Sequence, residues 1–455
     1  MNSKMILDCL NKHLALNENS KVVVVGLGET GFSSAQFLHQ HAIPFAVIDS
    51  RKNPPFSDAL LQNFPDIAVF TGEFSQPAFA VATHILVSPG VCLREKVIQG
   101  AIEAGVRLIS DIDLFACSTD KPIVAITGSN GKSTVTTMLG TMATEAGVKT
   151  AIGGNLGIAA LDLLDENVEL YILELSSFQL ERTAVLNAKV ATVLNISADH
   201  LDRHLGLSNY AKAKQRIFSG DGVMVINEDD AIVNRMYRED RETLFFSVHK
   251  KKGFHIATHQ DEEWLFNEKQ ALMRRAELPL EGMHNVANAL AALALGTAIK
   301  LDVKAMCEGL RQYKGLCHRM QKVAKIKDVT WINDSKATNI GACIAALKGY
   351  QEKVILIAGG DAKGADIDEL VPIINAKAKY VVLLGKDADK IELAIKGSVP
   401  SYRASTIQDA VKIAADIAEK GDCVLLSPAC ASIDQYKNYK ERGDIFTAAV
   451  MELAA

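Results

Sequence analysis

The sequence lacks a charge excess, a long apolar run and any closely spaced cysteine pair. Its 49 basic and 54 acidic residues give a formal charge of -5, so the composition gives no indication of nucleic acid or an acidic membrane surface as a partner. Its apolar runs, such as "KYVVLLG" at 379–385, are as long as strands and fall short of the ~20 residues that span a bilayer, so we expect no membrane insertion. The eight cysteines include no C-x-x-C pair, and no basic head precedes an apolar core at the N-terminus. Both absences favour reduced thiols and a cytoplasmic protein.

What the sequence does contain is a repeated α/β pattern. At 455 residues it is too long for one domain, because single cores stop growing at ~250 to 300 residues. Short β-branched runs that end in glycine or a small polar residue are each followed by a helical pattern, and they fall into three blocks: 1–110, 111–315 and 316–455. This pattern predicts an α/β fold with parallel sheets and crossover helices. Residues 243–281 alternate and are rich in turns, which predicts a small antiparallel sheet.

A glycine-rich loop at 125–134, "AITGSNGKST", joins a predicted strand to a predicted helix. It resembles the Walker A motif, but Ile126 stands where that motif has its first glycine, so the loop is shorter. Backbone N–H groups at such a helix start bind phosphate oxygens, the lysine meets phosphate charge and a hydroxyl can ligate Mg²⁺. A plain strand–helix turn would explain the glycines but not the Lys-Ser-Thr triplet. The predicted phosphate-binding residues are Gly128, Asn130, Gly131, Lys132, Ser133 and Thr134.

Polar residues follow two later strands. Glu174 ends an apolar run, so its carboxylate is expected at the carboxyl edge of the sheet, where it could hold Mg²⁺ beside a nucleotide; the alternative is an exposed acid at a strand end. His200 and His204 have the i,i+4 spacing of zinc ligands, but the glutamate of H-E-x-x-H is missing, which argues against zinc hydrolysis. We therefore expect His204 to be structural or solvated. Lys214, in "AKAKQR", looks by itself like part of a charged helix face.

The N-terminal "GLGETG" at 26–31 meets the G-x-G-x-x-G dinucleotide fingerprint, and Asp49 ends the next strand in the ribose-binding position. An NAD site is therefore an alternative interpretation of the first block. Nothing else in the chain indicates a dehydrogenase. A non-catalytic NAD-binding or nucleotide-sensing protein would also leave Glu174, His200 and Lys214 without a role.

The order of the motifs resembles the Mur ligase family over nearly the whole chain. The short T-G-x-N-G-K-[ST]-T loop is typical of Mur ligases and folylpolyglutamate synthetases. The downstream stretches that carry the resemblance are "GGNLG", "LELSSFQL", "NISADHLDRH", "YAKAKQRIF", "MHNVANALAALAL", "HRMQ", "NDSKATN", "GGDAKGAD" and "LLSPACASIDQYKNYKERG". The resemblance implies a Rossmann-like N-terminal domain that holds UDP, a central ATPase domain of the P-loop type and a Rossmann-like C-terminal domain that binds an amino acid.

The resemblance also implies roles for single residues. The catalytic set would be Lys132, Glu174, His200 and Lys214, with Lys214 carbamylated by CO₂. Two Mg²⁺ ions would be held through Ser133, Glu174, His200 and Lys214, and ATP would also contact Asn285, Arg319 and Asp334. The UDP end of the substrate would meet Gly28, Thr30, Asp49, Ser50, Arg51, Ser88 and Gly90, and its sugar and alanyl parts Asn155 and Gln179. The amino acid would meet Lys336, Thr338, Lys363, Ser432 and Tyr439. The chain departs from the family pattern at Cys317, usually proline, and at Tyr439, commonly phenylalanine.

The reaction that the resemblance implies is ATP-dependent addition of D-glutamate to UDP-N-acetylmuramoyl-L-alanine in peptidoglycan precursor synthesis. It would pass through an acyl phosphate and a tetrahedral intermediate, catalysed by a cytoplasmic monomer. Within the family, alternatives are a ligase that adds another amino acid, or a folylpolyglutamate synthetase. The UDP-type first block argues against the folate enzyme, and the ending "SPACASIDQYKNYKERG" favours D-glutamate.

Overall fold

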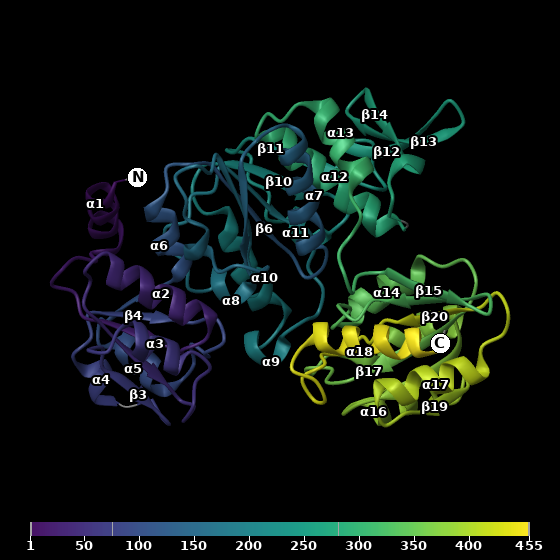
Figure 1. Cartoon of the computed structure of the whole chain (residues 1–455). Coiled ribbons are helices and arrows are strands. Elements are labelled where there is room, and N and C mark those ends of the chain that lie inside the picture. Colours follow the sequence, from purple (N-terminus) through teal and green to yellow (C-terminus); the bar gives the residue numbers. More distant parts are fainter. Residues whose placement is uncertain (1, 75, 281, 454–455) are drawn as a thin grey trace.

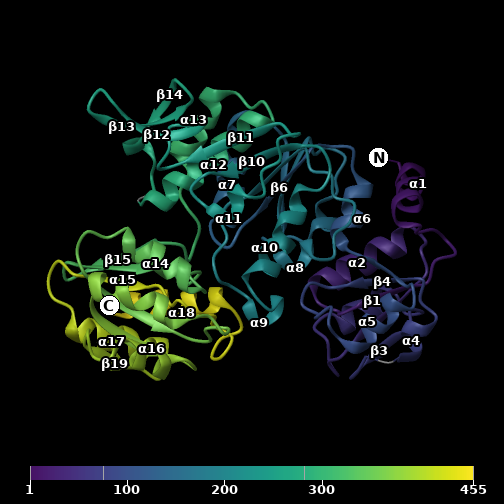
Figure 2. The same ribbon diagram turned by 180° about the vertical axis from the view of Figure 1, so that it is seen from behind.

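The computed structural model describes residues 2–74, 76–280 and 282–453, and shows three lobes that follow one another along the chain (Figure 1). The expected segment 243–281 and the expected blocks 1–110 and 316–455 include a few residues outside these ranges. Within the described residues the strands form three sheets, one in each lobe. Figure 2 shows from behind that the central lobe lies between the other two. The α/β fold predicted from the sequence is confirmed.

The first lobe has a parallel sheet with strand order β3-β2-β1-β4-β5. Its strands are β1 Val22–Val25, β2 Phe45–Asp49, β3 Val69–Thr71, β4 His84–Val87 and β5 Arg107–Ile109. Its helices are α1 Ser3–Leu14, α2 Glu29–Gln40, α3 Ser57–Asn63, α4 Gln76–Ala80 and α5 Lys96–Glu103. All four residues of β1 are buried, as expected of a strand covered on both faces. The strand order reverses at β1, and ligands of such sheets bind at that point, outside the carboxyl ends of the strands.

The central lobe has a sheet with order β14-β13-β12-β11-β10-β9-β6-β8-β7. Its strands are β6 Ile123–Thr127, β7 Thr150–Gly154, β8 Leu170–Glu174, β9 Val190–Val193, β10 Val223–Asn227, β11 Thr243–Ser247, β12 Phe254–His259, β13 Glu262–Asn267 and β14 Gln270–Arg274. Its α-helices are α6 Asp111–Ser118, α7 Lys132–Glu145, α8 Ser177–Leu180, α9 Leu201–His204, α10 Leu207–Gln215, α11 Ala231–Asn234, α12 Met283–Ala298 and α13 Val303–Gln312. Short 3₁₀ turns are η1 Ala160–Leu163, η2 Arg216–Phe218 and η3 Arg275–Glu277. Helices α7, α12 and α13 bury their apolar side chains in one core with this sheet.

The prediction of a small antiparallel sheet at 243–281 is wrong in part. Strand β11 pairs in parallel with both β10 and β12, and only β12, β13 and β14 pair antiparallel. These strands therefore extend the central sheet. The alternating pattern was visible because hairpin strands keep one face towards solvent, whereas the parallel pairing of β11 with strands on either side leaves no local signal in the sequence.

The third lobe has a sheet with order β15-β16-β20-β17-β18-β19, parallel except for the β15–β16 pair. Its strands are β15 Gln321–Ile326, β16 Val329–Asn333, β17 Val354–Gly359, β18 Ala378–Leu384, β19 Ser401–Arg403 and β20 Cys423–Leu426. Its helical segments are α14 Ile340–Lys348, η4 Ile367–Leu370, α15 Val371–Lys377, α16 Ala388–Ile395, α17 Ile407–Ile417 and α18 Tyr439–Glu452. Two apolar clusters pack its helices on both faces of the sheet.

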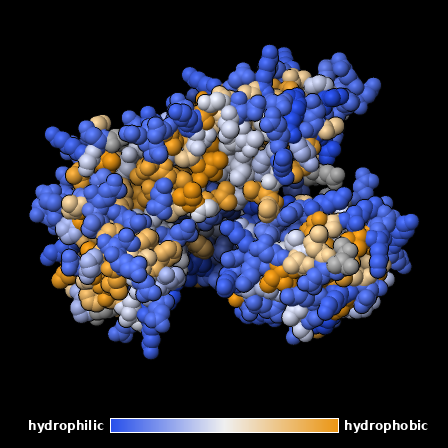
Figure 3. All heavy atoms as spheres, viewed as in Figure 1, coloured by the Kyte–Doolittle hydropathy of each residue, from blue (hydrophilic) through white to orange (hydrophobic). Residues whose placement is uncertain are grey.

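The surface is mostly hydrophilic, with apolar residues gathered on parts of each lobe (Figure 3). In the described part of the chain, no helix has both the length and the apolar character needed to cross a membrane. Even the strongly apolar α12 has only 16 residues.

Candidate active site

A cavity of about 1050 Å³ lies between the central and third lobes. From the central lobe it is lined by the loop 129–134, the end of β8, the segment 194–200 and the start of α12. From the third lobe it is lined by the segments 316–322 and 334–346. Of the described residues, none that precedes Ser129 lines it. The cavity therefore brings together the glycine-rich loop and the third-lobe motifs, and leaves the first-lobe fingerprint outside.

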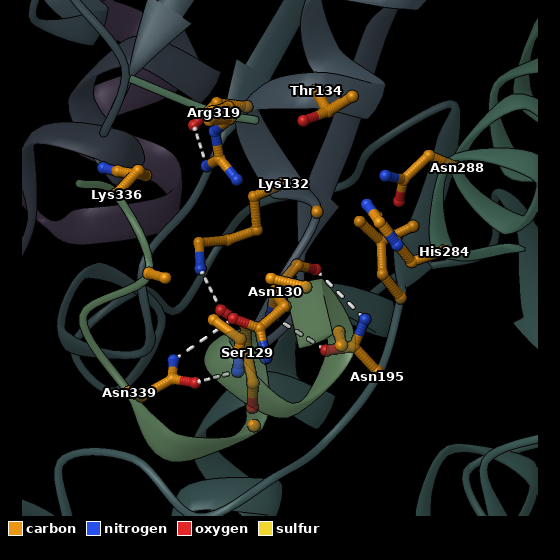
Figure 4. Close-up of a pocket in the computed structure, with 18 of the residues that line it drawn as sticks. Ser129, Asn130, Lys132, Thr134, Asn195, His284, Asn288, Arg319, Lys336 and Asn339 are labelled. Atoms are coloured by element: carbon orange, nitrogen blue, oxygen red, sulfur yellow. Dashed lines mark hydrogen bonds between the residues drawn. The ribbon is translucent and has the colours of Figure 1, made fainter. Parts of the chain in front are cut away.

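The glycine-rich loop connects β6 to α7 and is held rigidly. Gly131 adopts φ +83°, a left-handed conformation, and a Cβ there would lie 2.5 Å from Oδ1 of Asn288, so only glycine fits. The N–H of Asn130 donates to Oδ1 of Asn195 at 2.8 Å. The ammonium of Lys132 bends back to donate to the carbonyls of Gly128 and Ser129 at 2.8 and 2.9 Å (Figure 4). The start of the 14-residue α7 adds its partial positive charge, so the loop has the features of an anion-binding site.

Glu174 lies at the end of β8 beside this loop and is 1% exposed. Its Oε1 accepts a hydrogen bond from the side-chain amide of Asn155 at 2.6 Å, whereas its Oε2 is buried without a hydrogen-bond partner. Burial alone would raise the pKa of Glu174, but the charge of Lys132 and the polar side chains of Ser133 and Asn155 hold that pKa below its usual value. The result is a buried, ionised carboxylate with one oxygen available, which suits a hard cation such as Mg²⁺.

His200 and His204 have different surroundings. His204 is buried, its Nε2 lies 3.0 Å from Oγ of Ser177, and its ring stacks on Phe178 with centroids 5.4 Å apart. It is thus a structural histidine, as expected. His200 is partly exposed at the cavity, and burial lowers its pKa to about 4, so its imidazole is neutral at physiological pH. In the described residues, no group of three or more His, Cys, Asp or Glu side chains is arranged to hold a metal ion.

Lys214 is buried in the cavity wall, contrary to its appearance as part of a charged helix face. It is 1% exposed, whereas the neighbouring Lys212 is exposed. Its ammonium donates to Oγ1 of Thr127 at 3.1 Å and lies 4.8 Å from the ring centre of Tyr210. Burial and the nearby charge of Lys132 lower the pKa of Lys214 well below its usual value. A lowered pKa increases the share of the neutral, nucleophilic amine at Lys214.

The third lobe contributes cations and an acid to the same cavity. Arg319 donates from Nη2 to Oγ of Ser133 at 3.1 Å, directly beside the loop. Asp334 accepts hydrogen bonds from Oγ of Ser427 and the N–H of Met320, and burial raises its pKa to about 7. Burial, together with neighbouring cations, lowers the pKa of Lys336 to about 7.

Other predicted residues lie at or beyond the rim of the cavity. Asn285 and Thr338 line it, whereas Lys363, Ser432, Tyr439 and Gln179 are not among its lining residues. Lys363 nevertheless reaches the central lobe, where its ammonium lies 2.6 Å from Oδ1 of Asp199. The ring of Tyr439 lies under the ammonium of Lys336 at 3.8 Å. Gln179 points inward, and its Oε1 accepts from the N–H of Ser176 to cap α8.

The residues predicted to hold UDP gather at the carboxyl ends of β1, β2 and β4. Asp49 accepts from the N–H of Leu27 at 2.7 Å and pairs with Arg51 at 2.6 Å, which fixes the fingerprint loop. A Cβ on Gly31 would lie 1.9 Å from the carbonyl oxygen of Gly26, so α2 packs against the loop only with glycine at 31. The remaining members of this group are Gly28, Thr30, Ser50, Ser88 and Gly90, of which Ser88 uses its hydroxyl to donate to Gly26.

The sequence interpretation missed several polar residues of the cavity. Asn195 supports the loop and Asn288 lies beside Gly131, as described above, while Asp199 and Asn339 connect the two lobes. Asn339 belongs to the "NDSKATN" stretch and Asp199 and Asn195 to "NISADHLDRH", so the motifs were found but these members received no role.

Family models for Mur ligase domains match three parts of the chain. The model for the MurD-like N-terminal domain of Mur ligases matches residues 20–110, and the model for the Mur ligase middle domain matches 126–296. The model described as the Mur ligase glutamate ligase domain matches 318–430. Together these matches cover well over half of the chain.

Curated relatives and solved structures agree with these matches. The UDP-N-acetylmuramoylalanine–D-glutamate ligase of Methylococcus capsulatus is 51% identical over 443 residues, which cover 97% of this chain and 96% of that protein. The enzyme of the same name from Pseudomonas aeruginosa is 46% identical, over 95% of this chain and 98% of that protein.

Among solved structures, the chain is similar in fold to a pseudomurein peptide ligase type C from Methanothermus fervidus. The TM-score is 0.63 and the identity 20%, and the match covers 96% of this chain and 100% of that protein. It is also similar in fold to the UDP-N-acetylmuramate–alanine ligase MurC of Thermotoga maritima. The TM-score is 0.61 and the identity 18%, and the match covers 95% of this chain and 100% of that protein. The chain belongs to the Mur ligase family of ATP-dependent, amide-bond-forming ligases.

Proposed function

We propose that the chain joins D-glutamate to UDP-N-acetylmuramoyl-L-alanine at the expense of ATP, in the synthesis of peptidoglycan precursors. The observation that carries this proposal is the similarity, over nearly the full length of the chain, to relatives named for this reaction. The chemistry of the cavity supports it, because a phosphate-binding loop and an ammonium-rich third-lobe wall face the same space.

In the first step, the carboxylate of the UDP substrate attacks the γ-phosphorus of ATP, ADP leaves, and an acyl phosphate forms. Two negatively charged groups must approach each other for this attack, so the main task of the protein is to offset charge. The N–H groups of the loop and the ammonium of Lys132 are suited to bind the β- and γ-phosphates, and Arg319 adds a charge from the third lobe beside Ser133. Asn285 and Asp334 complete the proposed ATP site.

Mg²⁺ fits the residues present. The free Oε2 of Glu174, the hydroxyl of Ser133 and the neutral ring of His200 are suitable donors at the end of β8 and beside the loop. When bound, Mg²⁺ would neutralise phosphate charge and hold the phosphoryl oxygens in place. The site would use substrate phosphates as further ligands, which agrees with the small number of protein carboxylates there.

Lys214 is the proposed site of carbamylation. A neutral lysine amine adds to CO₂ and releases a proton, which leaves an anionic carbamate in place of a cation. The burial and low pKa of Lys214 favour this product. The carbamate oxygens would then supply a further ligand for a second Mg²⁺ ion.

In the second step, the amine of D-glutamate attacks the acyl carbon, a tetrahedral intermediate forms, and phosphate leaves. Lys336, Thr338, Lys363, Ser432 and Tyr439 are the proposed amino-acid site. Lysines suit a dicarboxylate because its second carboxylate needs partners when it loses water. Tyr439 provides an aromatic ring whose face already contacts the ammonium of Lys336.

The first lobe would hold UDP through Gly28, Thr30, Asp49, Ser50, Arg51, Ser88 and Gly90. Asn155 beside Glu174 would face the sugar and alanyl parts, whereas Gln179 would act through its cap on α8. The three domains of the proposal are 1–110, 111–315 and 316–455. We also propose that the protein is a cytoplasmic monomer, as the family resemblance implies.

The decisive experiment measures phosphate release from ATP and Mg²⁺ in the presence of UDP-N-acetylmuramoyl-L-alanine. D-Glutamate is compared with L-glutamate, L-lysine and meso-diaminopimelate. We expect release with D-glutamate alone. Release with another amino acid would keep the family and change the step, and no release with any of them would refute the proposal.

A further inference from the structure

Asn339 makes hydrogen bonds that join the third lobe to the central lobe. It is the N-cap of α14, and its side-chain Oδ1 accepts from the N–H of Ala342 at 2.8 Å. Its Nδ2 donates to Oδ1 of Asn130, in the phosphate loop, and to Oδ2 of Asp199, both at 3.2 Å. Figure 4 shows the Asn339 side chain directed at the loop. Because the cap uses its oxygen, the amide has one orientation, with the nitrogen facing the central lobe.

The two acceptors of Asn339 are themselves fixed. The loop at Asn130 is held by Asn195, whose Oδ1 accepts from the N–H of Asn130 at 2.8 Å and whose Nδ2 donates to its carbonyl at 3.1 Å. Asp199 is 8% exposed, and its second oxygen accepts from the ammonium of Lys363 at 2.6 Å. Both oxygens of Asp199 therefore bind donors of the third lobe. Hydrogen bonds to a buried charge are the stronger ones, so Asp199 is the firmer of the two anchors.

The position of Asn339 in the chain gives this contact a consequence for the reaction. The residues directly before it, Lys336 and Thr338, face the cavity and belong to the proposed amino-acid site. Lys363, the other donor to Asp199, belongs to the same proposed site. The contacts of Asn339 and Asp199 thus set the distance between the amino-acid site and the phosphate loop. The loop itself keeps its shape through Asn195 without them.

We propose that Asn339 is a positioning residue which, with Asp199 as its main acceptor, docks the amino-acid lobe on the phosphate loop for the attack of the amine on the acyl phosphate. The inference rests on the proposed function and extends it to a residue that makes none of the proposed substrate contacts. Loss of the docking contact impairs the amide-forming step more than acyl phosphate formation, because the proposed amino-acid site lies on the third lobe, whereas the phosphate loop keeps its shape through Asn195.

The test compares Asn339→Ser with Asn339→Asp. Serine and aspartate both cap helices about as well as asparagine, so α14 keeps its cap in both variants. Serine is too short to bridge the lobes. Aspartate has the length of asparagine but places a carboxylate opposite Asp199. If Asn339 only caps α14, both variants should form the amide as fast as the parent. If it docks the lobes, the rate of amide formation should be highest in the parent, lower in the serine variant and lowest in the aspartate variant. Asn2→Ser, at the N-cap of α1, is the matched control.

Two reactions are measured on each variant. The first contains ATP, the UDP substrate and hydroxylamine but no amino acid, and the hydroxylamine traps the acyl phosphate as a hydroxamate. The second contains D-glutamate instead of hydroxylamine and gives the amide. We expect hydroxamate formation to fall by less than amide formation in both variants, and kcat/KM for D-glutamate to be lower by roughly tenfold in Asn339→Ser and roughly a hundredfold in Asn339→Asp.

Three results would overturn the inference: an equal loss of hydroxamate and amide, no loss of amide formation in either variant, or a serine variant as defective as the aspartate variant. If the parent protein forms no hydroxamate with the UDP substrate, the proposed function itself fails, and this outcome is distinct from the other three.

Discussion

Replacement of Lys132 by methionine separates the nucleotide site from the UDP site. Methionine keeps most of the length and apolar volume of the lysine chain and removes its charge. The ammonium donates to the carbonyls of Gly128 and Ser129, and no described residue before Ser129 lines the cavity that it faces. The change therefore removes the charge that we propose to bind phosphate in the central lobe, and it leaves the first lobe untouched.

The expected magnitude follows from these contacts. Loss of one preorganised group that stabilises transition-state charge costs roughly 10²–10³ in rate, so hydroxamate formation and phosphate release should fall by about that factor. Loss of two hydrogen bonds to loop carbonyls should lower the free energy of unfolding by about 1–3 kcal/mol. Because Lys132 is the main charge that holds down the pKa of Glu174, that carboxylate should also protonate more readily in the variant.

The assay combines single-turnover phosphate release with calorimetric binding of UDP-N-acetylmuramoyl-L-alanine. Lys121→Met, at an exposed lysine of the same lobe, is the control for a change of charge. We expect the UDP substrate to bind Lys132→Met within about twofold of the parent, since distant sites contribute independently. An equal loss of binding and turnover would refute the assignment of phosphate and UDP to different lobes.

Three further predictions use other parts of the molecule. With ¹³C-labelled bicarbonate, NMR should show a carbamate signal that disappears in Lys214→Arg, and the same variant should lose phosphate release; a signal that persists would place the carbamate elsewhere. The kcat/KM for D-glutamate should fall as the pH rises through about 7, because Lys336, whose pKa is about 7, then loses the charge that attracts a carboxylate, and Lys336→Arg, which stays charged, should flatten this profile. Gly31→Ala should abolish binding of the UDP substrate, since its Cβ would lie 1.9 Å from the carbonyl oxygen of Gly26, while ADP binding measured by calorimetry stays within about twofold.

The sequence predicted most of the fold because parallel strands buried on both faces are continuous apolar runs. Val22–Val25 and Val354–Gly359 are buried at every position, and such runs are visible without any structure. The parallel pairing of β11 with β10 and β12 was not predictable, because a local pattern indicates that a strand forms but not the direction in which its neighbours run. Strand order in general is set by packing of the whole lobe, which local patterns do not report.

Some residues of the candidate site could likewise be predicted from local sequence patterns, and others could not. The loop at Lys132 and the acid Glu174 could be predicted from local order, since each follows a buried strand at the carboxyl edge of the sheet. Lys214 could not, because its burial depends on contact with Thr127, 87 residues earlier in the chain. Only the family resemblance singled it out. Gln179 shows the opposite case, in which a residue next to a site uses its side chain to cap a helix.

The electrostatics of the cavity connect these residues to the order of the chemistry. Lys132, Lys214 and Lys336 all have lowered pKa values, first because they are buried and then because they and Arg319 repel one another. Glu174 and Asp199 are the nearby acids that offset this repulsion. A polyphosphate between the lobes would favour the charged form of each lysine. Domain docking and nucleotide binding should therefore strengthen each other, since the third lobe adds Arg319 and Lys336 to a central lobe that already holds two buried lysines. Once phosphate leaves, the same repulsion favours separation of the lobes and release of the product.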